Sequence, residues 1–245
     1  FNDVLIADRG TGESLGFIDL APLATNSSGT PRADSLVEAD GLVLVSLQNV
    51  DAAFVEYGPG ILAVVDPTTD RILSRITMVG RNPFGPPAVH PATGRLYFAM
   101  AGIFQGSLDR ELSGGIEVID PNTLTTLGLI VDDDDLGGNI SAAALARAGG
   151  TIIGYCVVTL PSGVNVVRSF DPDTGAIFPA TVFQSAAFLP TLASDGDGFL
   201  LIPVHDINDP RLAVLDAGSG RIVASLRLSL PPFSIAVLTR GFLGD

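Results

Sequence analysis

The chain has 245 residues, of which 47% are hydrophobic and 16% charged, and its formal net charge is −14. This composition excludes a disordered chain, and no apolar run reaches the roughly 18 residues that a membrane-spanning helix needs. The acidic balance, in which every cation is an arginine, repels phosphate backbones, so we expect no nucleic-acid partner.

The first predicted elements are two short β-rich segments, residues 4–7 and 14–19, which have the character of the second and third strands of a four-stranded repeated unit. The stretch 20–31 is rich in Ser, Thr, Pro and Gly, and we expect it to be largely irregular. At the other end, residues 233–238 again form a β-rich run. We expect this last strand to complete the N-terminal unit, which would remove exposed sheet edges.

Between the ends, one local pattern recurs five times at intervals of 45 to 54 residues. Each copy is a short strand that ends in Asp, followed by a turn rich in Pro, Gly, Thr or Ser and then by a second strand. An Asp side chain can accept backbone N–H groups in such a turn. The five turns are expected near Asp19, Asp66, Asp120, Asp171 and Asp216.

Two further strands precede each of these hairpins. In one copy, residues 87–90 lead through a Pro-Ala-Thr-Gly turn into 95–100; in another, 190–193 lead through Ser194–Gly198 into 199–204. Four antiparallel strands, named a to d from the inside outward, repeated at this period are typical of a propeller blade. The sequence therefore predicts a single all-β domain over 1–245, a β-propeller of five four-stranded blades.

Several segments resemble a known repeat family. They are Asp66-Pro67-Thr68-Thr69, Asn82-Pro83-Phe84-Gly85-Pro86, His90–Tyr97 and Gly114–Pro121. They are similar to the YVTN-type β-propeller repeats of bacterial surface, lipoprotein and periplasmic proteins. The resemblance implies a propeller and an extracytoplasmic location, whether periplasmic, secreted or lipid-anchored at the cell surface. It implies no particular activity, because one fold serves many functions.

The b-to-c and d-to-a connections of a propeller share one face, and here they are long and irregular. Two of them, residues 48–59 and 102–114, belong to neighbouring blades and mix aromatic, amide and charged side chains. Such a mixture suits recognition of a protein or a carbohydrate. Four candidate ligand-binding residues follow: Gln48, Tyr57, Phe104 and Arg110. The alternative is that Phe54 and Phe104 fold back and cap the central channel.

The starts of the a strands ring the mouth of the channel on this same face. They supply Arg32, Asp34, Asn82, Phe84, Asn139, Ser141, Pro190 and Phe233, of which the first five are candidate ligand-binding residues. These residues form a site only if their polar groups converge on one point. The alternative is a ring of Asn and Pro residues that only caps the strands.

Metal and catalytic patterns are sparse. The run Asp132–Asp135 offers oxygen ligands for calcium, but the EF-hand spacing is absent, so a solvated d-to-a loop is preferred. Asp206–Asp209 is a weaker calcium candidate. His90 and His205 are expected at opposite faces, which excludes a site with several histidines. Cys156 lies in an apolar run, so we expect its side chain to be buried. We expect no cofactor, with calcium as the one alternative.

Two hypotheses remain. The preferred one is a non-enzymatic extracytoplasmic binding or scaffold propeller that recognises a protein or a carbohydrate through its loop face. The alternative is a hydrolase or lactonase with a calcium or carboxylate centre in the channel, which requires acids clustered at the channel mouth. The sequence specifies neither the ligand nor the oligomeric state.

Overall fold

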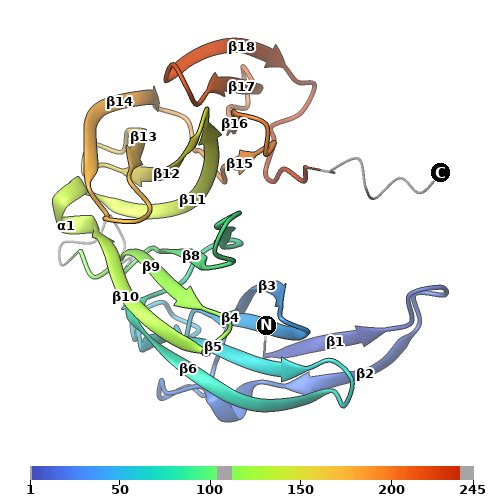
Figure 1. The fold of residues 1–245 in the computed structure, drawn as a ribbon. Coiled ribbons are helices and arrows are strands. Elements are labelled where there is room, and N and C mark those ends of the chain that lie inside the picture. The colour runs from blue at the N-terminus through green and yellow to red at the C-terminus, as the bar shows by residue number, and fades with distance from the viewer. Residues whose placement is uncertain (1, 104–111, 238–245) are drawn as a thin grey trace.

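A computed structural model describes residues 2–103 and 112–237 of the chain. The described part is almost entirely β-structure, and its sheets follow one another around an arc (Figure 1). The first sheet is a two-stranded hairpin formed by β1 (Asp3–Ala7) and β2 (Ser14–Asp19). None of the described helices is long and apolar enough to cross a membrane.

Four sheets of four antiparallel strands follow, each paired in chain order. The second sheet contains β3 (Ala33–Ala39), β4 (Leu42–Leu47), β5 (Pro59–Asp66) and β6 (Arg71–Arg81). The third contains β7 (Ala88–Val89), β8 (Leu96–Met100), β9 (Gly115–Asp120) and β10 (Thr125–Asp132). The fourth contains β11 (Asn139–Ala148), β12 (Thr151–Thr159), β13 (Asn165–Phe170) and β14 (Ile177–Ser185). The fifth contains β15 (Ala193–Ser194), β16 (Phe199–Val204), β17 (Arg211–Asp216) and β18 (Arg221–Arg227).

The predicted hairpin turns are present at Asp66, Asp120, Asp171 and Asp216, whereas Asp19 is followed by a 3-10 turn and not by a second strand. Asp66 Oδ1 accepts the backbone N–H and the hydroxyl of Thr68, at 2.8 and 2.7 Å. Asp216 Oδ1 accepts the same two groups from Ser219, both at 2.7 Å. Equivalent backbone bonds run from Ala21 to Asp19, from Asn122 to Asp120 and from Asp173 to Asp171. The repeated hairpins thus follow from a local bond that Asp supplies within its own turn.

Neighbouring sheets pack face to face, and a separate apolar cluster fills each junction. Leu44 and Leu62 of the second sheet, for example, pack with Phe98 and Met100 of the third. Residues of the third and fourth sheets share a second cluster, and residues of the fourth and fifth share another. The middle strands β5, β8, β9, β12 and β13 therefore bury both faces, which explains their near-continuous hydrophobic sequences.

Buried polar side chains also link successive sheets. The hydroxyl of Tyr97 in β8 donates to the carbonyl of Pro172 in the next sheet, at 2.8 Å, and Tyr155 in β12 donates to Ala217 at 3.3 Å. The fully buried Glu117 in β9 accepts the N–H groups of Val79 and Gly80 from β6, at 2.9 Å each. These bonds fix how each blade is seated against its neighbour.

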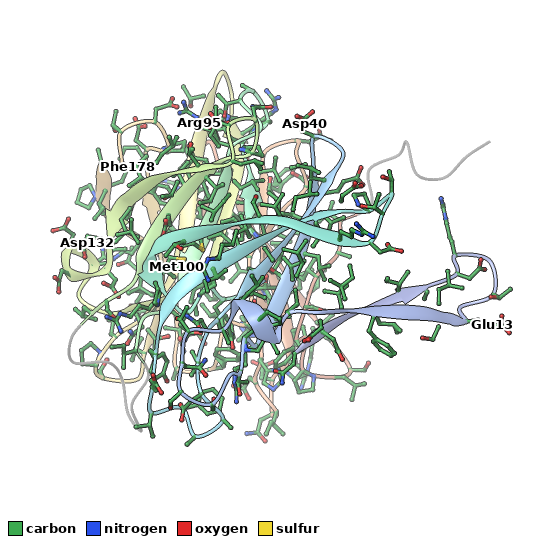
Figure 2. All side chains as sticks on the ribbon, turned by 90° about the horizontal axis from the view of Figure 1, so that it is seen from below. Glu13, Asp40, Arg95, Met100, Asp132 and Phe178 are labelled. Atoms are coloured by element: carbon green, nitrogen blue, oxygen red, sulfur yellow. The ribbon has the colours of Figure 1, made fainter. Side chains whose placement is uncertain are left out.

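The all-β propeller class is confirmed, and two details differ from the prediction. The first repeat is a two-stranded hairpin rather than a four-stranded blade, and a short 3-10 turn, Ala21–Leu23, lies in the expected irregular stretch after it. Figure 2 shows this hairpin extending away from the other sheets, with Glu13 at its tip.

The predicted C-terminal strand is also absent from the described residues 228–237, so it does not complete the first hairpin. Pro231 and Pro232 have no N–H group to donate to a strand ladder. The segment instead contacts the loops of its own sheet. Leu228 N donates to Pro210 O at 2.8 Å, and His205 Nδ1 lies 3.1 Å from Pro232 O.

Candidate functional site

A pocket of about 460 Å³ opens on the predicted loop face, where the starts of the inner strands meet the ends of their neighbours. Three sheets contribute its wall through the starts of their inner strands and the b-to-c loops, and a fourth adds one aromatic ring. The described lining residues are Arg32, Gln48, Phe54, Tyr57, Asn82, Phe84, Ala101, Ser141, Thr159, Asn165 and Phe188.

The lining residues occupy equivalent positions in successive repeats. The carbonyl of Arg32 accepts the N–H of Gln48, and the carbonyl of Asn82 accepts the N–H of Ala101, both at 2.9 Å. The carbonyl of Phe188 accepts the N–H of His205 in the same way, also at 2.9 Å. The second, third and fifth sheets therefore each present one residue from the segment before the inner strand to the pocket.

Arg32 is the one cation in the described lining. Its guanidinium lies 3.9 Å from the centre of the Phe54 ring, a cation–π contact. Its Nε is buried and has no hydrogen-bond partner among the described residues, and none of the described carboxylates forms an ion pair with it. Arg32 also has a left-handed backbone, with φ of 52°, which is strained for a residue other than glycine.

Ser141 supplies a second unpartnered polar group. It is the extra residue of a β-bulge, because Ile140 pairs with Val158 and Ala142 with Val157. A bulge turns the side chain of its extra residue away from the regular alternation of the strand. Ser141 is only 7% exposed, and its Oγ has no hydrogen-bond partner among the described residues.

The aromatic side chains of the lining differ in exposure. Phe54 is 48% exposed and Phe188 is 38% exposed, so their rings are available to a ligand. Tyr57 is only 6% exposed and packs as part of the wall, where its carbonyl accepts Arg81 Nη1 at 2.6 Å. Of the four rings, Phe54 and Phe188 offer the most exposed apolar contact surface, and the partly buried Phe84 adds to it.

The amide side chains at the pocket already have partners. Asn82 Nδ2 donates to Gly102 O at 3.2 Å, and Asn165 donates to Ala187 O at 3.1 Å while its Oδ1 accepts the hydroxyl of Thr159 at 2.8 Å. Gln48 Nε2 donates to Asp34 Oδ1 at 3.2 Å. The amides therefore act mainly as clamps between chain segments, as the alternative interpretation of a capping ring expects.

The structure brings five of the nine predicted site residues together. Arg32, Gln48, Tyr57, Asn82 and Phe84 all line the pocket. The convergence that the sequence could not establish is therefore present for these five.

Asp34 lies beside the pocket rather than in its described lining. Its carboxylate accepts the N–H of Gly85 at 2.6 Å, and desolvation of the carboxylate raises its pKa, an effect that this hydrogen bond opposes. Asn139 is buried and donates to the carbonyl of Ala101 at 2.9 Å, so it supports the pocket from beneath. Phe104 and Arg110 lie outside the described residues.

Several lining residues were not among the predicted set. They are Phe54, Ala101, Ser141, Thr159, Asn165 and Phe188. Phe188 has the same repeat position as Arg32 and Asn82, because its carbonyl also accepts an N–H from the end of the neighbouring strand. Ser141 lies at a different position, as the extra residue of a bulge within β11. An alignment of the repeats with one another would have found Phe188, whereas Ser141, Thr159 and Asn165 carry no such signal.

The acidic run at 132–135 does not form a solvated loop, which corrects the prediction. It forms the single-turn helix α1 (Asp133–Leu136), with Asp132 accepting the N–H of Asp134 and Gly137 ending the helix in a left-handed conformation. Asp133 is fully buried, and its Oδ2 accepts the N–H of Gly114 at 3.0 Å.

The other metal and nucleophile candidates also have structural contacts. In the described part of the chain, no group of three or more His, Cys, Asp or Glu side chains is placed to hold a metal ion. Asp206 accepts the N–H groups of Asn208 and Asp209 within its own turn. Burial raises the pKa of the Cys156 thiol to about 12, so Cys156 is a buried side chain, as predicted.

No family model matches the sequence, and no curated protein matches it either. Solved structures share its fold. Hydrazine synthase of Kuenenia stuttgartiensis has a TM-score of 0.58 at 15% identity, over 84% of this chain and 51% of that one. Dihydro-heme d1 dehydrogenase NirN has a TM-score of 0.56 at 17% identity, over 94% and 43%. The Dos1 propeller has a TM-score of 0.58 at 10% identity, over 84% and 50%.

These similarities show a β-propeller fold and nothing more specific, because all three identities are low. The chain spans about half the length of each of these structures. The YVTN resemblance finds no support from a family match.

Proposed function

We propose that the protein is a binding or scaffold propeller that works outside the cytoplasm and holds a protein or a carbohydrate on its loop face. The observation that carries the proposal is the pocket at the channel mouth, which the repeat builds from equivalent positions of successive blades. Pockets of this size, mostly apolar with a few polar groups, are typical ligand sites. The strained backbone of Arg32 at this point adds support, because such strain gathers at functional sites.

The lining favours binding over the hydrolase or lactonase alternative. That alternative needs acidic groups facing one another at the channel mouth. The described lining has one charged side chain, Arg32, and it is a cation. Asp34, the adjacent carboxylate, is held by Gly85 N and Gln48 Nε2.

To test this proposal, the purified protein is screened for ligands with a phage-displayed peptide library and a glycan array. The double variant Phe54→Ala with Phe188→Ala removes the two exposed rings, and it should weaken binding of any selected ligand about tenfold or more. The control is Leu73→Ala with Val223→Ala, two exposed apolar residues on the outer strands β6 and β18. Equal losses in both double variants, or turnover of the bound ligand, would contradict the proposal.

A further inference from the structure

The pocket wall offers a ligand very few free polar groups. The amides of Asn82, Asn165 and Gln48 already donate to protein oxygen atoms. Arg32 Nε and Ser141 Oγ are the two buried polar atoms of the lining without a hydrogen-bond partner among the described residues. A buried donor or acceptor left unpaired is costly, so both atoms indicate a partner that is supplied from outside the protein.

These two groups define the polar end of the ligand. The guanidinium of Arg32 is already stacked on Phe54, which leaves its N–H edge as the part that can meet an acceptor. A guanidinium edge matches the two oxygens of a carboxylate, and the Ser141 hydroxyl can donate to the same group. Because Arg32 and Ser141 line the same pocket, we expect one carboxylate to bind both groups.

The rest of the wall defines the other end of the ligand. Phe54, Phe84 and Phe188 supply aromatic surface, and Ala101 adds a further apolar wall. A sugar ring would bring several hydroxyl groups that have no free partner here, and each would lose hydrogen bonds to water. A flat apolar body loses none and stacks on the rings.

We infer that this pocket binds a flat, apolar monocarboxylate, with its carboxylate on Arg32 and Ser141 and its apolar body against Phe54 and Phe188. The inference goes beyond the proposed function by naming the chemistry that this part of the loop face accepts. Such a group has two sources, a free aromatic acid or the C-terminal carboxylate of a protein that ends in an aromatic residue.

Isothermal titration calorimetry with 2-naphthoate tests the chemistry, with 2-naphthamide as the uncharged partner of the same shape. The acid should bind at least about tenfold more tightly than the amide, because only the acid makes the charged bond to Arg32. Equal affinities, or no binding of the acid, would overturn the inference.

Two variants test the residues. Ser141→Ala should lower the affinity for 2-naphthoate about fivefold to tenfold while leaving the melting temperature unchanged or higher, because its Oγ has no described partner to lose. Ser169→Ala, at another buried serine, is its control and should leave the affinity unchanged. Arg32→Gln should lower the affinity about tenfold to a hundredfold, whereas Arg71→Gln on β6 makes the same change in net charge and should not.

A peptide that ends in Phe, with a free or an amidated C terminus, separates the two sources. Tighter binding of the free peptide than of 2-naphthoate assigns the site to a protein C terminus, and the reverse order assigns it to a free acid; both support the inference. Loss of affinity in Ser169→Ala equal to that in Ser141→Ala would overturn it. The library screens test the proposed function, and the titrations test the carboxylate inference. A negative screen therefore does not decide the outcome of the titrations.

Discussion

In each repeat, the aspartate at the end of the strand accepts at least one N–H from the residue two or three positions ahead. The hydrogen bonds from Thr68 hold the pKa of Asp66 below its ordinary value, and the bonds from Ser219 do the same for Asp216. Hydrogen bonds from Thr11 and Gly10 also lower the pKa of Asp8 in the tip of the first hairpin. The folded state therefore favours the ionised form of these side chains.

This preference predicts an acid dependence of stability. Because the folded pKa values of Asp66 and Asp216 lie below the unfolded value of about 3.9, their contribution is present above that pH and is lost as the pH falls through the folded values. The double variant Asp66→Asn with Asp216→Asn should melt below wild type at pH 7, and the gap should close towards about pH 3. Thermal melts followed by circular dichroism measure the melting temperatures of the wild type and the double variant at each pH. A gap that stays constant with pH would contradict the prediction, and Glu38→Gln, at an exposed strand carboxylate, is the control.

At the scale of elements, the junction between the second and third sheets depends on Glu117. This buried carboxylate accepts two backbone N–H groups from β6 and the hydroxyl of Thr126 from β10. Tyr97 supplies the corresponding link from the third sheet to the fourth with a single neutral hydrogen bond. The two junctions therefore carry bonds of very different strength.

Single substitutions should reveal this difference. Glu117→Ala leaves several buried donors without an acceptor and should lower the free energy of unfolding by about 3 to 5 kcal/mol. Tyr97→Phe removes one hydroxyl and should cost about 0.5 to 1.5 kcal/mol. Urea unfolding measures both values. A larger loss for Tyr97→Phe than for Glu117→Ala would show that the buried carboxylate is not the main link.

At the scale of the whole molecule, the two ends of the arc differ from its middle. The first hairpin has one neighbouring sheet, and its other face carries Leu5, Leu15 and Phe17 at 55%, 67% and 63% exposure. All seven residues of β18 are exposed at the opposite end. The sheets between them are packed on both faces (Figure 1).

Hydrogen exchange should follow this gradient. Amides of β1, β2 and β18 should exchange faster than those of β8 and β12, because local opening costs less where few apolar contacts are lost. Mass spectrometry of peptic fragments resolves these segments. Equal protection in β18 and β12 would contradict the prediction.

Much of the fold follows from short-range patterns in the sequence. The Asp turns and the four-strand period can be predicted from the sequence because each depends on residues that are close in the chain. Two predictions were wrong for local reasons. No strand forms in the described part of 233–238, because Pro231 and Pro232 just before it have no backbone N–H to donate. Residues 133–136 form a helical turn and not a loop, because Asp132 and Gly137 cap its two ends.

The candidate site was predicted in part. Arg32, Gln48, Tyr57, Asn82 and Phe84 were found from their phase in the repeat, and they meet at one pocket. Ser141 was placed in the ring at the channel mouth but was not among the nine candidates, because the bulge that directs its side chain leaves no mark in a single sequence. Phe188 was missed because its place is clear only when the fifth repeat is aligned with the second and third.

The sequence by itself determined the β-propeller class, the turn chemistry and the phase of the strands in the four complete sheets, because those properties arise from contacts within one hairpin. Only the tertiary structure decided which side chains converge. Arg32 and Phe188 are separated by more than half of the chain, and the packing of successive sheets brings both to one pocket. The same packing buries Ser141 Oγ and Arg32 Nε without partners, which no local pattern specifies.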